Sequence, residues 1–485
     1  MSELLKKAQK YQAVEEKEIP KKQRPMFHMS APVGWINDPN GWSVYKDEYH
    51  LFFQYHPYGT YWGPMHWGHM KTNDFIKWEL LPVAMAPDKE YDNKGCFSGS
   101  AMEDGDSHIL MYTGVFEEDN SGIVHTYQAQ CIAIGDGLHY TKLECNPVIV
   151  AADLPEGCNQ HDFRDPKIWK DNGIYYAVIG SKDQNNDGQV VLFQSEDLKK
   201  WEYVNCVDQS NHQYGKMWEC PDLFRLQGKD ILLTSPQFME AQGLEFHNGN
   251  GTLCIIGNLD EGSKLCRENL HAIDYGLDFY APQTLETKDG RRVMIGWLQS
   301  WDNHITPENF KWSGIMSIPR ELTIQEGRLY QYPVREIEHY RSERYTYRER
   351  LRNGNVYNQI MCGREFDMII KLENAACDSF EIRLGVGDKK YTSIRYEMNR
   401  NPITFDRTYS GLYKDFICER QMKVDKFHDG MEIRILMDKY SIELFVDDGK
   451  YAMSSLIYTE LSCNGIDFVT DGEIDIIVEK YKVCI

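Results

Sequence analysis

Short runs of apolar residues recur along the first two thirds of the chain, and each follows a segment rich in Pro, Gly, Asn, Asp or Ser. We call the segment rich in turn-forming residues the head of each unit. A head of this kind, followed by an apolar run of five or six residues and a polar turn, is typical of β-strands. The five runs span residues 49–54, 108–112, 174–179, 230–234 and 292–297. Their heads span residues 38–41, 97–100, 164–166, 219–222 and 280–283. This repetition predicts five copies of one β unit between residue 35 and about residue 300.

A second repeat interleaves with the first and gives its period. Residues 72–79 resemble residues 195–202, and a weaker version lies at residues 135–140. The aspartates of the three copies, Asp74, Asp136 and Asp197, lie 62 and 61 residues apart. This period is longer than the ~40–50 residues of common propeller repeats, but it fits a four-stranded blade with long loops. Five copies therefore predict a five-bladed β-propeller.

The two ends of the chain follow different patterns. Residues 3–18 carry a loose apolar stripe at helical spacing, and Pro20 and Pro25 end it, so we expect a short N-terminal helix on the body. A disordered tail is the alternative. Residues 320–345 are rich in Arg and Glu and are interpreted as a linker with a hairpin that turns at residues 326–328.

From about residue 346 the chain alternates between apolar and polar positions, most clearly at residues 432–435 and 442–446. Alternation of this kind predicts half-buried strands of a β-sandwich. The predicted fold is thus all-β, a five-bladed β-propeller followed by a C-terminal β-sandwich. The predicted division is an N-terminal helical extension at residues 1–24, a propeller at 25–336 and a sandwich with its linker at 337–485.

Composition narrows the possible partners. The 485 residues include 74 Asp and Glu against 53 Lys and Arg, a formal net charge of −21. This charge repels nucleic acid and anionic membranes, so we expect neither as a partner. Residues 1–24 lack the apolar core of a signal peptide, and the 13 cysteines are scattered without a Cys-x-x-Cys motif. We therefore expect reduced thiols and a cytoplasmic location.

Metal binding is not expected from the sequence. His56, His66 and His69 lie close together, but no carboxylate has a matching register, and His-x-x-His spacing alone is a weak signal. Gly34, Gly41 and Gly63 do not form a phosphate-binding loop. We expect no cofactor.

Three of the repeat heads carry an acid. Asp38, Asp165 and Glu219 stand at the head of the first strand in units one, three and four. The first strand of each propeller blade lines the central channel, so these carboxyls should meet at one end of it. Two convergent carboxyls about 5–5.5 Å apart can cut a glycosidic bond with retention, one as nucleophile and one as acid.

The neighbours of each acid suggest how the roles divide. Asn37 can donate a hydrogen bond to Asp38 and keep it ionised. Glu219 lies between Trp218 and Cys220 with no adjacent cation, surroundings that favour a protonated carboxyl. Asp165 follows Arg164 and should stay charged, which suits it to hydrogen bonding with sugar hydroxyls. A direct contact between Arg164 and Asp165 is open, because adjacent strand residues point to opposite sides.

Six ordered motifs resemble those of glycoside hydrolase family 32, the invertases, sucrose-6-phosphate hydrolases and fructan hydrolases. They lie at residues 35–41 (WINDPNG), 95–100 (GCFSGS), 164–166 (RDP), 219–221 (ECP), 278–283 (DFYAPQ) and 441–445 (SIELF). The resemblance covers nearly the whole chain and implies a five-bladed propeller joined to a β-sandwich. The N-terminal residues 4–11 look most like those of the intracellular bacterial sucrose-6-phosphate hydrolases.

Carried over by position, the resemblance implies that Asp38 is the nucleophile, Glu219 the acid and base, and Asp165 the residue that holds the fructose hydroxyls. It also implies a fructose pocket, and the residues assigned to substrate binding are Trp35, Asn37, Gln54, Trp62, Phe97, Ser98, Arg164 and Trp297.

The implied activity is a retaining β-fructofuranosidase that acts on sucrose or sucrose 6-phosphate through a covalent fructosyl–Asp intermediate. An exo-fructanase for short fructo-oligosaccharides would use the same catalytic residues, and a non-catalytic carbohydrate-binding propeller is the alternative from another class. Transfer of fructose to a second sugar would use the same intermediate. Whether the protein is a monomer or a homodimer is open.

Overall fold

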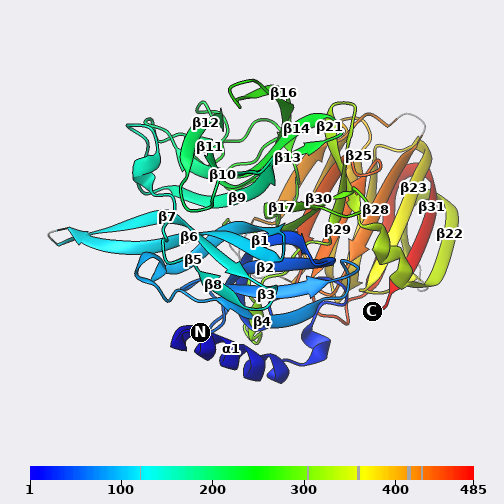
Figure 1. Ribbon diagram of the computed structural model, residues 1–485. Coiled ribbons are helices and arrows are strands. Elements are labelled where there is room, and N and C mark those ends of the chain that lie inside the picture. The colour runs from blue at the N-terminus through cyan, green and yellow to red at the C-terminus, as the bar shows by residue number, and fades with distance from the viewer. Residues whose placement is uncertain (121, 303–304, 358–360, 412–416, 428–429) are drawn as a thin grey trace.

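The computed structural model describes residues 1–120, 122–302, 305–357, 361–411, 417–427 and 430–485. The predicted fold is confirmed, since five four-stranded blades surround one axis and a β-sandwich follows them (Figure 1). Blade one contains β1 (Gly34–Tyr45), β2 (Glu48–His56), β3 (His66–Thr72) and β4 (Glu79–Met85). Blade two contains β5 (Gly95–Asp104), β6 (Ser107–Asn120), β7 (Ile123–Gly135) and β8 (Tyr140–Lys142).

The other three blades repeat this meander of antiparallel strands. Blade three contains β9 (Phe163–Asp171), β10 (Ile174–Lys182), β11 (Gly188–Ser195) and β12 (Glu202–Gln209). Blade four contains β13 (Met217–Leu226), β14 (Lys229–Gln237), β15 (Leu253–Leu259) and β16 (Leu265–Ala272). Blade five contains β17 (Tyr280–Glu286), β18 (Arg292–Trp297), β20 (Arg320–Gln325) and β21 (Arg328–Pro333).

The hairpin at residues 326–328 corrects one expectation. It connects β20 and β21, which are the two outer strands of blade five, and is not part of a linker. The Arg and Glu content of residues 320–345 indicated a linker, but Arg320 is fully buried and Glu321 pairs with Arg291 of the same blade.

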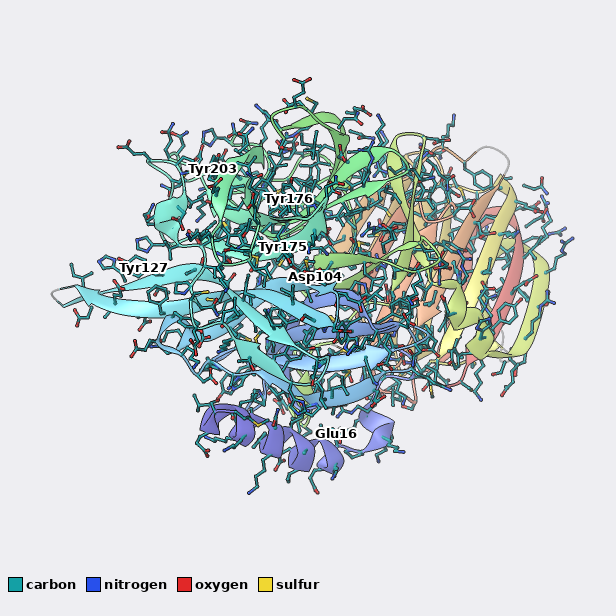
Figure 2. All side chains as sticks on the ribbon, viewed as in Figure 1. Glu16, Asp104, Tyr127, Tyr175, Tyr176 and Tyr203 are labelled. Carbon is teal, nitrogen blue, oxygen red and sulfur yellow. The ribbon has the colours of Figure 1, made fainter. Side chains whose placement is uncertain are left out.

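The ring closes through its inner strands. β1, β5, β9, β13 and β17 each contact the next, and β17 contacts β1. The short strand β19 (Trp312–Ser313), which comes after β18 in the chain, adds to blade one beside β1 in a parallel pair. Side chains join blades as well: Asp104 of blade two lies near Tyr175 of blade three (Figure 2). Asp104 accepts hydrogen bonds from Tyr175 and from Lys170, also of blade three.

Every inner strand carries a β-bulge at its head. The register shifts fall at residues 36–39, 97–99, 164–167, 219–222 and 280–283, and in four of the five a proline lies within the bulge. Proline has no N–H to donate, so it is tolerated in a strand where the ladder is already interrupted. A bulge turns nearby side chains away from their regular direction. The Asp-Pro sequences that resemble turns therefore lie within strands and aim their acids into the channel.

The second repeat marks the turn between the third and fourth strands of a blade. Asp74, Asp136 and Asp197 each accept hydrogen bonds from two backbone N–H groups of that turn. Such local caps are the usual reason for Asp in tight turns. The repeat is therefore structural and recurs in blades one, two and three.

The N-terminal helix α1 (Glu3–Glu15) is capped by Ser2 and lies against blade one. Gln9 and Gln12 donate side-chain hydrogen bonds to backbone carbonyls of β4, at Val83 and Leu81. These contacts exclude the alternative of a disordered tail. Short 3₁₀ helices occupy Glu16–Glu18, Lys21–Gln23, Glu90–Asp92, Ala151–Asp153 and Arg335–Tyr340. None of the helices in the described ranges is long and apolar enough to cross a membrane.

The sandwich is organised by one long strand, β31 (Gly465–Val483), which pairs with β22 (Arg341–Tyr357) on one side. On its other side it pairs first with β24 (Ser379–Gly387) and then with β23 (Phe366–Ala376). The remaining strands are β25 (Lys390–Glu397), β26 (Pro402–Asp406), β27 (Glu419–Lys423), β28 (Met431–Met437), β29 (Ser441–Val446) and β30 (Tyr451–Leu456). The domain boundaries at residues 24/25 and 336/337 stay a prediction.

A buried network of charges joins the propeller to the sandwich. His28 lies between two carboxylates of the sandwich, with its ring nitrogens 2.9 Å from Asp438 and 2.8 Å from Glu443. Arg320 of blade five binds Glu443 and, at 3.0 Å, Asp274. The side chains of all five residues are fully buried. Because removing one partner would leave an uncompensated buried charge, the network fixes how the two domains dock.

The first prediction concerns His28. Burial alone would lower its pKa, but the hydrogen bonds and charges of Asp438 and Glu443 raise the pKa to about 9. A raised pKa gives stability that is complete below the ordinary value of 6.5 and is lost as pH rises through about 9. We expect wild-type protein to lose roughly 3 kcal/mol of unfolding free energy between these limits through this group.

Urea unfolding at pH 6.5 and pH 9.5 measures the effect. His28→Gln, which keeps hydrogen-bonding capacity, should be less stable than wild type at pH 6.5 and should lose less stability on going to pH 9.5. A surface variant, His139→Gln, is the matched control and should follow wild type. Equal losses in wild type and His28→Gln would contradict the assignment.

Candidate active site

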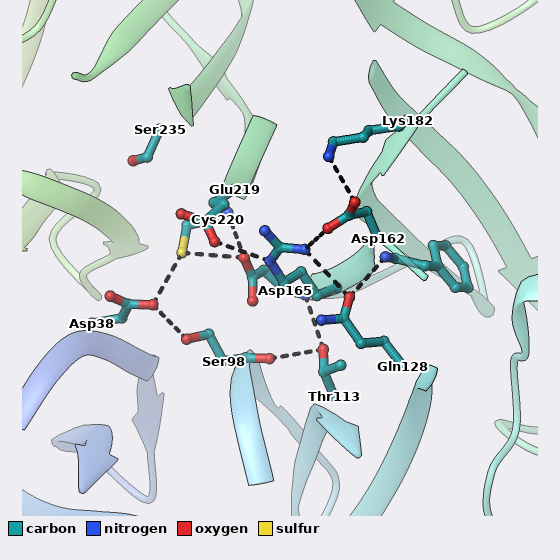
Figure 3. Close-up of polar contacts among 12 residues, drawn as sticks. Asp38, Ser98, Thr113, Gln128, Asp162, Asp165, Lys182, Glu219, Cys220 and Ser235 are labelled. Carbon is teal, nitrogen blue, oxygen red and sulfur yellow. Dashed lines mark hydrogen bonds and ion pairs between the residues drawn. The ribbon is translucent and has the colours of Figure 1, made fainter. Parts of the chain in front are cut away.

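A cavity of about 310 Å³ opens at the end of the channel where the bulged heads lie. The three acids, Asp38 from β1, Asp165 from β9 and Glu219 from β13, all line it (Figure 3). Its volume is that of a small-ligand site. The other lining residues are Asn37, Gln54, Trp62, Phe97, Ser98, Gln128, Asp162, Arg164, Gln237 and Trp301.

Asp38 is held by three side-chain donors. The Asn37 amide donates to its Oδ1 at 3.0 Å, as the sequence suggested, and the Ser98 hydroxyl donates to its Oδ2 at 2.6 Å. The Cys220 thiol lies 3.6 Å from the same Oδ2. Burial and the nearby charge of Glu219 raise the pKa of Asp38, and the three hydrogen bonds oppose this rise. The donors also fix the direction of the carboxylate.

Glu219 has a cation beside it, contrary to the expectation from its chain neighbours. Arg164 of blade three donates from Nε to Glu219 Oε1 at 2.9 Å, and the Tyr280 hydroxyl of blade five donates to Oε2 at 2.7 Å. Asp38 and Asp165 directly precede the proline of their bulge, whereas Glu219 stands one residue earlier, before Cys220-Pro221. Arg164 and Tyr280 also stand one residue earlier, so the three side chains occupy one level of the channel.

Asp165 was expected to stay charged beside Arg164, and the structure does not support this. The Arg164 guanidinium points instead to Glu219 and, at 2.8 Å, to Asp162. Burial and the charge of Glu219 raise the pKa of Asp165 to about 7, and the Arg164 charge offsets this only in part. Asp165 accepts a hydrogen bond of 3.0 Å from the Cys220 backbone N–H. Its backbone is also strained, with φ at +66°.

Most of the predicted substrate-binding residues line the cavity. Trp62 is 48% exposed at the mouth and stands edge-on to Phe97, with ring centres 5.8 Å apart. Gln54 donates to the Cys96 carbonyl at 3.0 Å, which fixes its amide.

Trp35 and Trp297 are not among the cavity-lining residues. Both are buried behind the cavity wall, where Trp35 donates to Asn37 at 2.9 Å and Trp297 packs against Trp301. Their position supports the wall, and direct contact with a sugar stays a prediction.

Sequence reasoning missed four of the lining residues and one contact behind them. Asp162 stands two residues before Arg164 and could have been noticed from the motif. Gln128 lies on the third strand of blade two, Gln237 on the second strand of blade four and Trp301 in a loop, and no repeat marks these positions. Tyr280 belongs to the motif at residues 278–283, which carries no sign that its hydroxyl reaches Glu219.

No group of three or more His, Cys, Asp or Glu side chains with metal-binding geometry occurs in the ranges that the structure describes. The polar groups that line the cavity are its carboxyls, Arg164 and the amide and hydroxyl donors around them.

Two family models match the chain. The glycosyl hydrolases family 32 N-terminal domain matches residues 28–333, and the glycosyl hydrolases family 32 C-terminal model matches residues 336–484. A sucrose-6-phosphate hydrolase of Escherichia coli is 36% identical over 441 residues, which are 90% of this chain and 89% of the relative. A raffinose invertase of the same species is 34% identical over 460 residues, 92% of this chain and 94% of the relative.

Among solved structures, a β-fructofuranosidase of family 32 from Bombyx mori superposes with a TM-score of 0.85 at 33% identity. The superposition covers 99% of this chain and 98% of the other. A mutant of the same enzyme in complex with sucrose gives a TM-score of 0.84.

The second prediction compares two aspartates of the cavity, Asp165, whose pKa is raised, and Asp162, whose pKa is lowered. The raised pKa of Asp165 means that the folded state binds its proton more tightly than the unfolded state does, so ionisation destabilises the fold. At pH 8 we expect Asp165→Asn to unfold at a higher temperature than wild type. The corresponding gain in unfolding free energy is up to about 4 kcal/mol. This gain should shrink as pH falls toward 4.

Asp162→Asn is the matched control. Burial opposes ionisation of Asp162, but Arg164 and Lys182 outweigh it and lower the pKa, so this variant should lose stability at pH 8. Thermal unfolding of both variants across pH 4–8 measures the difference. A destabilised Asp165→Asn at pH 8 would show that its carboxylate is favourable in the fold.

Proposed function

The chain belongs to glycosyl hydrolase family 32, and we propose that it is a retaining β-fructofuranosidase that hydrolyses the fructosyl bond of sucrose or sucrose 6-phosphate. The observation that carries the proposal is the pair Asp38 and Glu219, which face one cavity from different blades with different partners. Asp38 is held by the neutral donors Asn37, Ser98 and Cys220, whereas Glu219 lies between Arg164 and Tyr280.

In the first step the Asp38 carboxylate attacks the anomeric carbon of fructose. Glu219 gives its proton to the bridging oxygen, the second sugar leaves as an alcohol, and a fructosyl–Asp38 ester forms. In the second step Glu219 takes a proton from water, the hydroxide attacks the same carbon, and the Asp38 carboxylate leaves. Two displacements at one carbon retain its configuration.

Three carboxyls line the cavity, and burial together with the charge of Glu219 raises the pKa values of Asp38 and Asp165, that of Asp165 to about 7. The reaction needs a proton on Glu219 when substrate binds. Arg164 and Tyr280 hold the Glu219 carboxyl in place through their hydrogen bonds. Asp165 would hold fructose hydroxyls.

Several finer points belong to the same proposal. The substrate is a small sugar: the names of the E. coli relatives support sucrose 6-phosphate or raffinose, and the Bombyx mori complex supports sucrose. Thirteen cysteines, an odd number, support a reducing compartment, the cytoplasm. The assembly, monomer or homodimer, stays a prediction.

The third prediction tests the nucleophile. Pure protein should release fructose from sucrose, and Asp38→Asn should lower the initial rate by at least about 10⁴-fold, since no covalent ester can form. The circular dichroism spectrum should match that of wild type. The unfolding temperature should equal or exceed that of wild type, because a buried carboxylate is removed. Sucrose 6-phosphate, kestose and inulin, assayed beside sucrose, identify the preferred substrate. Near-normal turnover by Asp38→Asn would end the proposal.

The fourth prediction tests Glu219 as the proton donor. Glu219→Gln should lose most activity on sucrose but keep the first step with fructosyl fluoride, whose leaving group needs no proton. A burst of fluoride followed by slow turnover is expected, because the second step lacks its base. Azide, which needs no base, should accelerate that turnover. Equal loss on both substrates would argue that Glu219 only supports the structure.

A further inference from the structure

We propose that Phe238 is a specificity-determining residue of this site. Its phenyl ring forms an outer wall of the cavity mouth and contacts the sugar that leaves when the fructosyl bond is cut. The inference rests on the proposed function and extends it to the half of the substrate that lies outside the fructose pocket.

The backbone at Phe238 is strained without a gain in packing. Three large apolar residues in the described ranges have positive φ: Phe75 at +63°, Leu198 at +65° and Phe238 at +58°. Phe75 and Leu198 occupy the same turn in blades one and three, and their side chains are 1% and 7% exposed. Phe238 is 63% exposed. A left-handed backbone is unfavourable for a bulky residue, and burial offsets this at Phe75 and Leu198 but not at Phe238.

Phe238 stands next to the cavity, directly after the strand that pairs with the one carrying Glu219. Ser235 of β14 lies opposite Glu219 of β13, and Gln237, the last residue of β14, lines the cavity. Phe238 follows directly. The next residue, Met239, is buried and exchanges two backbone hydrogen bonds with Gly249, at 2.7 and 3.1 Å. The turn at Phe238 therefore separates a cavity-lining side chain from a buried one and directs the phenyl ring to solvent.

The loop after Phe238 is tied to the loop that carries Trp301. Asp302 accepts hydrogen bonds from the backbone and the side-chain amide of Asn250, both at 2.7 Å. Gly249 lies so close that a Cβ there would come within 2.4 Å of the Asp302 carboxylate. Trp301, the neighbour of Asp302, lines the cavity. Phe238 and Trp301 thus belong to two loops that are held together on one side of the mouth.

This side of the mouth is the one that the leaving sugar meets. Glu219, which protonates the bridging oxygen in the proposed reaction, lies on β13, and its partner strand β14 ends at Gln237, directly before Phe238. Asp38 and Ser98 come instead from the inner strands of blades one and two. An exposed phenyl face is suited to the C–H face of a pyranose ring. The strain at Phe238 is then the cost of placing this ring at the mouth.

The test uses four variants of the full chain. Phe238→Leu keeps the strain and an apolar side chain but loses the ring, Phe238→Gly loses the ring and relieves the strain, and Phe238→Tyr keeps the ring. Tyr409→Ala, an aromatic residue of the sandwich that is 54% exposed, is the matched control. For each variant, kcat and KM on sucrose, the inhibition constant of free fructose and the unfolding temperature are measured.

We expect Phe238→Leu and Phe238→Gly to lower kcat/KM on sucrose about fivefold, mainly through KM, a loss typical of one aromatic contact. Inhibition by fructose should not change, because fructose fills only the inner pocket. Phe238→Gly should unfold at a higher temperature than wild type, and Phe238→Tyr and Tyr409→Ala should keep kcat/KM within about twofold.

Two results overturn the inference. Unchanged kcat/KM in Phe238→Leu and Phe238→Gly would show that the ring does not contact the substrate. An equal loss of fructose inhibition would show that the variants disturb the inner pocket. A wild-type protein that releases no fructose from any fructoside would instead overturn the proposed function, and this inference with it.

Discussion

The closure of five blades around one axis is the constraint on which the rest of the structure depends. Each inner strand must contact its two neighbours, so the five bulged heads come to the same end of the channel. Residues 38, 165 and 219, far apart in the chain, then share one cavity of about 310 Å³. The parallel pair of β19 with β1 joins the last part of the propeller to the first. The buried network of His28, Arg320, Asp438 and Glu443 extends this order to the sandwich.

The same closure creates an unfavourable cluster of like charges. Asp38, Asp165 and Glu219 are brought together with Arg164 as the cation among them, and burial adds to their mutual repulsion. Strain at Asp165 and Cys220, with φ of +66° and +48°, lies in the same bulges. Such features are common at active sites, where function is kept at the expense of stability. Phe238 adds strain at the mouth of the cavity, outside the buried cluster.

Much of the architecture could be predicted because it repeats. The heads at residues 38–41, 164–166 and 219–222, with the apolar runs after them, indicated five blades, and the spacing of Asp74, Asp136 and Asp197 gave the period. Identical turns need identical local chemistry, so the pattern is visible in one sequence. The charged hairpin at residues 326–328 was misread, because exposed outer strands and linkers have similar compositions.

The partners of the acids could not be predicted in the same way. The sequence leaves open whether Arg164 contacts Asp165, its neighbour in the chain, and in the structure Arg164 binds Glu219 of the next blade. Glu219 stands one residue further from the proline of its bulge than Asp165 does, and this places it beside Arg164. The direction of each side chain depends on the bulge, which strand periodicity does not reveal. Gln128, Gln237 and Trp301 reach the cavity from positions outside the repeated heads. Contacts between blades depend on how the blades meet, which no local pattern encodes.

The central claim is that the ring gathers these residues so that Asp38 forms a covalent bond to fructose. Acid quenching during turnover, followed by intact-protein and peptide mass spectrometry, tests it most directly. The account predicts a mass increase equal to one fructose less one water, located on the peptide that contains Asp38. An adduct on Asp165 or Glu219, or release of fructose with inverted configuration and no adduct, would contradict it.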